Sequence, residues 1–132
     1  MHNFSDLIGI PYIKNGKDIN GFDCFGLVQE IYRRLGFVIP NLDYNDPDDV
    51  QFIDTLANNE KDKLTKQISK PEPYCFVLLM TVGTYVTHIG VVLEDCKSFI
   101  HTTKKKNVCV EKLDNVLWKQ KIKEFRKWKN FN

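Results

Sequence analysis

Long hydrophobic runs are absent from this sequence of 132 residues. The longest apolar run lies within Tyr74–Val82 and is far shorter than the roughly 18–20 residues that a membrane-spanning helix needs. The N-terminus carries Asp6 where a signal peptide has a basic patch followed by a long apolar stretch. We therefore expect no membrane span and a chain that is synthesised in the cytoplasm without a signal peptide.

Cysteine and histidine are scarce, with four and three residues. No two cysteines have the C-x-x-C spacing of structural zinc sites, so such a site would have to be assembled from cysteines and histidines scattered along the chain. Without a secretion signal, and with enough residues to build a core, the chain does not need disulfides. We expect four free thiols, no metal and no cofactor. The cysteines are Cys24, Cys75, Cys96 and Cys109.

Charge is nearly balanced overall, at +2, but it is unevenly distributed. Residues 1–103 hold 9 basic and 14 acidic side chains, whereas residues 104–132 hold 10 and 3. The basic segment could attract an anionic polymer, but a solvated terminal face is the simpler interpretation. We favour the second and expect no nucleic-acid partner. The length fits a single domain over residues 1–132.

The first half of the chain predicts two helices. Residues 1–22 lack a helical or strand period and are interpreted as a surface loop. Asp23 is a suitable N-cap for a helix over residues 24–35, in which Cys24 lies in the first turn on the apolar stripe. A second helix is predicted over residues 47–58, where an aspartate cap precedes a proline and further acids.

The second half predicts strands, because the apolar period changes after Pro71–Pro73. Residues 113–132 show neither period clearly, and we leave them as helix or strand. The chain is thus predicted to be α+β, with the cysteine-bearing helix packed on an antiparallel sheet of about four to six strands. The predicted strands, joined by short turns in a meander, are 74–82, 85–94, 98–103 and 108–112.

The predicted position of Cys24, in the first turn of a helix, favours a reactive thiol. A helix N-terminus places partial positive charge and N–H groups beside the sulfur, which stabilises the thiolate and can also receive an oxyanion. Free cysteine also packs well in protein cores, so a structural Cys24 is the alternative interpretation.

His88 and His101 lie on neighbouring predicted strands, and the turn between them decides whether they meet. A two-residue loop at Asp95-Cys96 sets a register in which His101 lies opposite Gly90. The two imidazoles are then diagonal neighbours on one face, about 7–8 Å apart and able to hydrogen bond. A three-residue loop would place them on opposite faces unless a bulge intervened, and two unrelated histidines remain the alternative.

Three motifs follow one another along the chain: Gly21–Val28 around the cysteine, Thr87–Leu93 around the first histidine and Phe99–His101 around the second. Together they resemble the NlpC family of papain-like cysteine peptidases of bacterial cell walls, in which the same three residues occur in the same order. The resemblance covers about residues 8–130. It implies a single NlpC-type domain with a papain-like fold, and hydrolysis of amide bonds in peptidoglycan stem peptides.

The resemblance also implies a role for each matching residue. Cys24 would be the nucleophile, His88 the general base and His101 the group that orients His88. Tyr12 and Asp23 would lie near the substrate.

Two departures from the usual family pattern lie near the expected cleft. Phe25 replaces a small hydroxyl residue, and Ile13–Gly16 replaces a Trp-Gly-Gly stretch. Phe25, together with residues 35–40, looks more like the branch associated with bacteriophage tail assembly. This resemblance implies phage tail proteins as partners, and a protein that is incorporated in a tail or acts at the cell wall.

Three function classes therefore stand side by side. The first and favoured one is a tail-associated cysteine endopeptidase. The second is a structural or assembly module of a tail that keeps the fold but cleaves little. The third is an anion-binding module that uses the basic residues 104–132, for which binding would depend steeply on salt.

Overall fold

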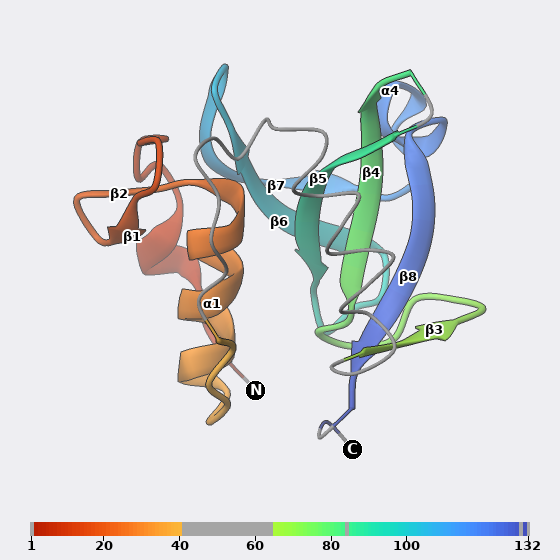
Figure 1. Ribbon diagram of the computed structural model, residues 1–132, viewed down its shortest axis with the longest axis horizontal. Helices are drawn as coiled ribbons and strands as arrows, with labels where there is room; N and C mark the ends of the chain where they lie inside the picture. Colours follow the sequence, from red (N-terminus) through yellow and green to blue (C-terminus); the bar gives the residue numbers. More distant parts are fainter. Residues whose placement is uncertain (1, 41–64, 84, 130, 132) are drawn as a thin grey trace.

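The computed structural model describes residues 2–40, 65–83, 85–129 and 131 of the chain. Within these ranges, one main helix packs against a six-stranded antiparallel sheet, which confirms the predicted α+β class (Figure 1). The helix predicted over residues 47–58 lies outside the described residues. The helices are η1 (Ser5–Leu7), α1 (Cys24–Arg34) and α4 (Val116–Lys119), and the strands are β1 (Lys17–Asp18), β2 (Gly21–Phe22), β3 (Thr65–Ile68), β4 (Phe76–Val82), β5 (Tyr85–Val92), β6 (Ser98–Thr103), β7 (Lys106–Lys112) and β8 (Ile122–Trp128).

The large sheet has the strand order β3-β8-β4-β5-β6-β7. Its run β4-β5-β6-β7 is the predicted meander. The tail that sequence patterns left open forms the short helix α4 and then strand β8, which inserts between β3 and β4. Strand β3 was not predicted, and the loop expected over residues 1–22 contains the small β1–β2 hairpin.

Helix α1 begins where the sequence indicates. The Oδ1 atom of Asp23 accepts a hydrogen bond from the Gly26 N–H at 2.6 Å, and the helix ends at Arg34, one residue earlier than predicted. Position 26 has no room for a larger residue, because the carbonyl oxygen of Gly16 occupies the place where a Cβ would stand. The same carbonyl accepts a hydrogen bond from the Asp23 N–H at 3.1 Å. The loop before the helix is thus held directly against its first turn.

The two faces of the sheet carry separate apolar clusters. One face packs against α1 through residues such as Phe76, Leu78 and Val91, and the other packs under Trp118 of α4 through residues such as Val77. Tyr32 anchors the helix to the first face, because its ring stacks on Phe76 at 4.9 Å and its hydroxyl donates to the backbone carbonyl of Tyr74. Burying both faces is typical of a sheet covered by other elements rather than by water.

The register of β5 shifts at Thr87. Leu79 pairs with His88 and the next residue, Met80, pairs with Val86, so Thr87 is an extra residue in β5. Simple alternation predicts Val86 and His88 on one face, and that expectation is wrong. The bulge leaves Val86 in the cluster under α1 and places His88 opposite Leu79, which belongs to the other cluster.

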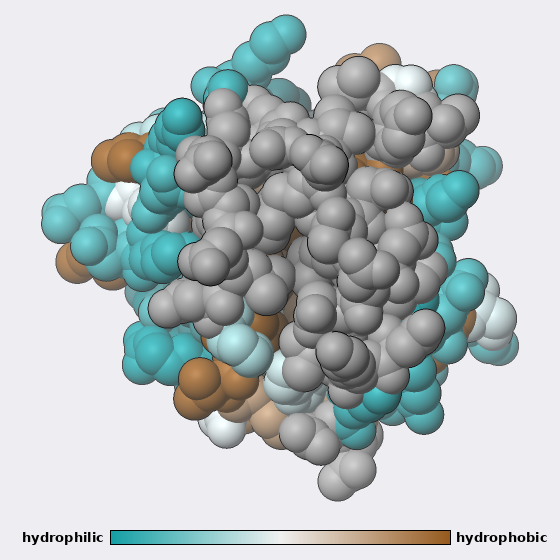
Figure 2. Space-filling view, in the orientation of Figure 1, coloured by the Kyte–Doolittle hydropathy of each residue, from teal (hydrophilic) through white to brown (hydrophobic). Residues whose placement is uncertain are grey.

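Where Figure 2 shows described residues, most side chains at the surface are hydrophilic. On the face shown in Figure 2, polar side chains line both sides of the molecule and hydrophobic ones emerge in small groups. Scattered exposed apolar residues of this kind are normal on a folded protein. In the part of the chain that the structure describes, no helix combines the length and apolar character of a membrane span.

Candidate functional site

Cys24 and His88 line the same cavity, of about 520 Å³, together with Tyr12. Cys24 comes from the first turn of α1, His88 from β5, and Tyr12 from the loop that pairs with Phe22 just before the helix. The remaining described lining consists of four threonines, four lysines, Leu117 and Trp118. Segments far apart in the sequence therefore converge on the cysteine predicted to be reactive.

Cys24 lies at the first helical position, where the helix N-terminus places partial positive charge next to the sulfur. Its side chain is 4% exposed, so the sulfur faces the cavity from a nearly buried position. Asp23 was also expected near the substrate. The structure buries Asp23 completely as the cap of α1, and it is not among the residues that line the cavity.

His88 and His101 meet as the predicted register requires. The Nε2 atom of His88 lies 2.7 Å from the Nδ1 atom of His101, in a buried hydrogen bond. Val91 pairs with Ile100 and Val92 with Phe99, which is the same register as the predicted pairing of Gly90 with His101. The Leu93 N–H donates to the carbonyl of Ser98, so Leu93 and Ser98 are still paired. The connecting loop is therefore residues 94–97, four residues rather than two. An even count keeps both histidines on one face.

Gly90 provides the space that brings the histidines together. A Cβ placed on Gly90 would lie 3.3 Å from the Cβ of His101 and 3.1 Å from the Phe99 ring. A larger residue at this position would therefore require the Ile100 carbonyl, the Phe99 ring or His101 to shift by a few tenths of an ångström.

Glu111 extends the pair into a chain of three residues. Its Oε2 atom lies 2.7 Å from Nε2 of His101. Sequence analysis missed Glu111, although the predicted strand 108–112 contains it. The signal was available in the strand alternation, because pairing of His101 with Cys109 places Glu111 two residues further along the same face.

The chain of hydrogen bonds fixes which ring nitrogen is basic. A carboxylate only accepts hydrogen bonds, so Nε2 of His101 carries a proton and donates it in the hydrogen bond to Glu111. In neutral His101 the other nitrogen, Nδ1, is then a hydrogen-bond acceptor. Nε2 of His88 must then donate to His101. The remaining nitrogen of His88, Nδ1, is left with a lone pair and can accept a proton.

Electrostatics favours the neutral form of both rings in the free protein. Burial, together with the nearby His101, lowers the pKa of His88 to about 3. Burial also lowers the pKa of His101, while the hydrogen bond and charge of Glu111 act in the opposite direction. Partial burial raises the pKa of Glu111, but His101 and Lys106 outweigh this effect and hold it below its ordinary value. Glu111 is therefore an anion at neutral pH.

Trp118 covers the histidine pair. Its ring lies edge-on to His101, with 4.8 Å between the centroids, and 6.0 Å from the His88 ring. Helix α4 holds it there, and Asn115 caps that helix by accepting a hydrogen bond from the Leu117 N–H at 2.8 Å. An indole over the pair keeps water away from it, which strengthens the hydrogen bonds beneath.

The rim of the cavity is cationic. Lys104 and Lys105 come from the β6–β7 turn, Lys106 from the first position of β7 and Lys121 from the turn before β8. The described lining contains no carboxylate. The basic residues of segment 104–132 were interpreted as a solvated face. Four of them are exposed, as that interpretation requires, and they also line the cavity that holds Cys24.

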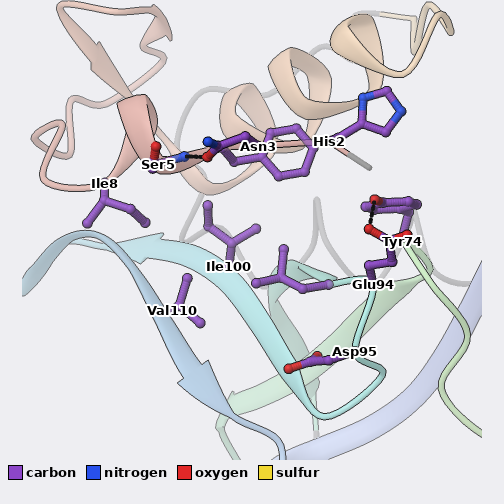
Figure 3. A pocket seen from close by; sticks show the side chains of 11 residues that line it. His2, Asn3, Ser5, Ile8, Tyr74, Glu94, Asp95, Ile100 and Val110 are labelled. Atoms are coloured by element: carbon purple, nitrogen blue, oxygen red, sulfur yellow. Dashed lines mark hydrogen bonds between the residues drawn. The ribbon is translucent and has the colours of Figure 1, made fainter.

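A second cavity, of about 730 Å³, lies on the face of the sheet that carries α1. Of the N-terminal residues that line it, Ile8 lies towards Ile100 and Val110, and His2 lies beside Tyr74 (Figure 3). It contains neither Cys24 nor the histidine pair, whereas Cys24 and His88 line the first cavity.

All four cysteines are free thiols. Only Cys24 lines the first cavity. Cys75 is buried just before β4, in the apolar cluster that contains Trp118, and Cys96 lies in the turn after β5. Cys109 neighbours His101 from β7.

Comparisons with known proteins agree with this geometry. The family model described as "NlpC/P60 family" matches residues 9–127. No curated protein matches the chain significantly. Among solved structures, an NLP/P60-family protein similar to a lipoprotein from Staphylococcus aureus is 23% identical (TM-score 0.64), and an NlpC/P60-family protein from Bacillus cereus is 20% identical (TM-score 0.69). The NlpC/p60 domain of the peptidoglycan hydrolase SagA is 21% identical, with a TM-score of 0.60.

The coverage of these structures differs. Each match includes 92% of this chain, which corresponds to 37% of the Staphylococcus protein, 36% of the Bacillus protein and 89% of the SagA domain. The chain thus spans little more than a third of the length of the first two proteins and most of the third. At these identities the likeness establishes a shared fold.

Proposed function

Because the chain belongs to the NlpC/P60 family, we propose that it is a cysteine endopeptidase that hydrolyses amide bonds in peptidoglycan stem peptides. The observation that carries this proposal is the convergence of Cys24, at a helix N-terminus, and the hydrogen-bonded His88 on one cavity. The structural likeness to the NlpC/p60 domain of a peptidoglycan hydrolase supports the same substrate class.

The proposed reaction begins with transfer of the Cys24 thiol proton to Nδ1 of His88. The thiolate attacks the amide carbonyl, and backbone N–H groups at the start of α1 stabilise the oxyanion. The intermediate collapses when His88 gives its proton to the leaving amine, and a thioester remains on Cys24. Water, deprotonated by His88, then attacks the thioester, and the thiol is regenerated with release of the carboxylic acid.

His101 and Glu111 act on this reaction as positioning residues. When His88 takes up a proton, its Nε2–H continues to donate to Nδ1 of His101, so the imidazolium has an acceptor rather than a competing donor. The negative charge of Glu111, transmitted through His101, stabilises the positive charge on His88. This compensates the burial that disfavours a charged His88 in the resting protein.

The cationic rim supports a peptide substrate that carries carboxylates. Stem peptides contain D-glutamate and a diamino acid, and both residues can supply such groups. Lys104, Lys105 and Lys106 are each exposed, so they reach an approaching anion without first being dehydrated. Attraction by clustered lysines raises the encounter rate and weakens as salt is added.

The direct test is digestion of purified peptidoglycan, with mass spectrometry of the released peptides. Cys24→Ala is expected to abolish cleavage, and Cys96→Ser, which removes a thiol outside the cavity, is the matched control. Cleavage by Cys24→Ala would contradict the proposal, as would an intact wild-type protein that releases no peptide.

A second test separates orientation of His88 from its chemistry. In serine proteases, replacing the orienting carboxylate by an amide costs about 10⁴-fold in turnover, because the amide permits the wrong tautomer. Glu111 acts one residue further from the reacting atoms, so Glu111→Gln is expected to lower kcat by a smaller factor with little change in KM. His88→Gln is expected to remove turnover. Equal kcat values for Glu111→Gln and wild type would show that Glu111 has no positioning role.

A catalytically weak assembly module of a phage tail is the second candidate, because Cys24 is 4% exposed and a substrate must reach it. Native alkylation of Cys24 at mildly acidic pH distinguishes the two. An activated thiol reacts faster than the other three and loses that advantage in His88→Ala, whereas a structural thiol does not.

The tail association belongs to the finer part of the proposal. It rests on the likeness of Phe25 and residues 35–40 to that branch. Immunoblotting of purified phage or tail particles tests it, and absence of the protein from the particles would contradict it.

A further inference from the structure

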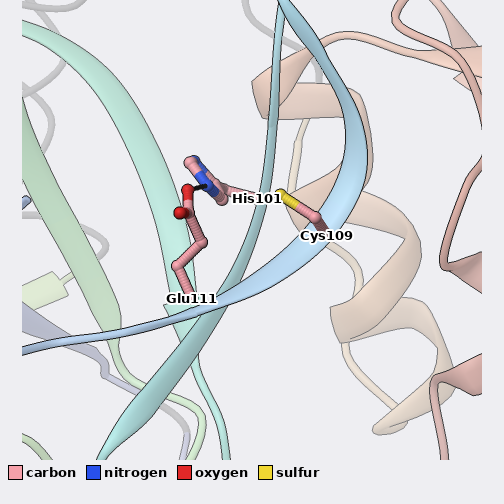
Figure 4. Close-up of side chains that lie close together, drawn as sticks. All are labelled: His101, Cys109 and Glu111. Atoms are coloured by element: carbon pink, nitrogen blue, oxygen red, sulfur yellow. Dashed lines mark hydrogen bonds and ion pairs between the residues drawn. The ribbon is translucent and has the colours of Figure 1, made fainter. Parts of the chain in front are cut away.

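His101 lies next to two further side chains of kinds that bind metal ions, a cysteine and a glutamate. His101 on β6 and Cys109 on β7 are paired across the sheet, and Glu111 follows two residues later on the same face. Their ligand atoms all lie within 4.8 Å of one another (Figure 4). We propose that His101, Cys109 and Glu111 bind a divalent transition-metal ion, with Zn²⁺ the best match, and that the bound ion switches off the peptidase site.

The donor set fits zinc. Zinc takes histidine nitrogen, cysteine thiolate and carboxylate oxygen as ligands, and a thiolate discriminates against Mg²⁺ and Ca²⁺. In a tetrahedral site, bonds of about 2.0–2.3 Å place neighbouring ligand atoms roughly 3.3–3.8 Å apart. Reaching that geometry from the present arrangement requires shifts of about an ångström. The two negative charges of a thiolate and a carboxylate also balance the charge of a divalent ion.

The site is accessible from the edge of the sheet. His101 is fully buried, but Cys109 and Glu111 are only partly buried and lie on β7, the outermost strand on this side. Lys106 contacts Glu111, with 3.4 Å between Nζ and Oε1, and opposes a cation. Its side chain is 52% exposed and can turn into solvent when the ion enters.

A metal ion on His101 reverses the direction of the hydrogen bonds. The ion occupies the Nε2 lone pair, so the proton of neutral His101 moves to Nδ1, and Nδ1 then donates to Nε2 of His88. Nε2 of His88 becomes the acceptor and its proton moves to Nδ1. The nitrogen that must take the Cys24 proton is then occupied, and an imidazolium at His88 would face a donor instead of an acceptor.

The proton balance of binding is simple. Cys109 releases its thiol proton to solvent as it becomes a thiolate ligand, and each histidine keeps one proton but changes the nitrogen that carries it. No oxidation or reduction takes place. The site itself is independent of the proposed function, whereas the inhibition rests on it.

Cobalt binding tests the site without a substrate. Co²⁺ adopts zinc geometries and gives a thiolate charge-transfer band in the near ultraviolet. We expect this band in Cys24→Ser, where the cavity thiol is removed, and in Cys24→Ser/Cys96→Ser, the matched control. It should disappear in Cys24→Ser/Cys109→Ser, and Zn²⁺ should displace the cobalt. A band that is absent from Cys24→Ser, or that survives loss of Cys109, overturns the site.

Hydrolysis in chelator-treated buffer with added Zn²⁺ tests the switch. Cys109→Ser is expected to match wild type without metal, and to need at least about tenfold more Zn²⁺ for half inhibition, since even loss of an outer-shell partner costs roughly 10–100-fold in metal affinity. Identical inhibition of both proteins overturns the switch, because zinc then acts at Cys24 directly. If wild type fails to hydrolyse at all, the proposed function fails while the cobalt result still decides the site.

Discussion

Lowering the pH from 7 to 5 should destabilise the folded protein through its two buried histidines. His88 and His101 are 5% and 0% exposed, and burial lowers the pKa of both. In the unfolded chain each has a pKa of about 6.5. The unfolded state therefore takes up protons first, so stability is constant above this value and falls as the pH drops towards the folded-state pKa.

The size of the effect follows from the number of protons. A histidine that is protonated only in the unfolded state costs about 1.4 kcal/mol per pH unit well below pH 6.5, or about 2 kcal/mol between pH 7 and pH 5. His88, with a pKa of about 3, contributes this amount in full. Glu111 opposes the shift at His101. The expected loss therefore lies between about 2 and 4 kcal/mol, for one or both histidines.

Urea unfolding at pH 7, 6 and 5, followed by tryptophan fluorescence, measures the loss. Carboxylates of unfolded chains titrate near pH 4, so this window isolates the histidines. His88→Gln is the control and should lose about 2 kcal/mol less than wild type over the same range. Equal stability of wild type at pH 7 and pH 5 would refute the reasoning. It would show that the folded protein takes up protons over this range as readily as the unfolded chain, so that burial does not hold these histidines neutral.

Three further outcomes are expected. Gly90→Ala should lower the free energy of unfolding by about 1–3 kcal/mol and reduce hydrolysis, because the added Cβ crowds strand β6 at the Ile100 carbonyl, the Phe99 ring and His101. Unchanged kinetics would contradict this. Asp23→Ala should destabilise by about 0.5–2 kcal/mol in urea unfolding, since the Gly26 N–H loses its cap, and Asp23→Asn should recover most of the loss. Cys75 should be the slowest thiol in native alkylation followed by mass spectrometry, because burial raises its pKa to about 11; labelling as fast as in urea would contradict this.

Local sequence signals were sufficient for the elements that carry the chemistry. The cap at Asp23 and the apolar stripe predicted α1 to within a residue at its end. The strand pattern and an even loop predicted that His88 and His101 meet and that Gly90 lies opposite His101. These features depend on residues close in sequence or on one hairpin, where alternation and turn length determine the geometry.

Other parts of the site depend on contacts that no local pattern encodes. The bulge at Thr87 changes the face on which Val86 lies, and bulges leave no clear trace in alternation. Residues 113–132 have a mixed period, because α4 and β8 each bury only part of their surface. Pairing of β8 with β4 determines which side of this segment is buried, and that pairing depends on residues far apart in the sequence.

The sequence by itself determined the order of cysteine and histidines, the start of α1 and the register that joins His88 to His101. Tertiary structure alone decided that Glu111 fixes the tautomer, that Trp118 covers the pair and that lysines gather at the cavity. The physical reason is range. Caps, periods and turns act over a few residues, whereas burial, charge and hydrogen bonding across strands depend on which segments the sheet brings together.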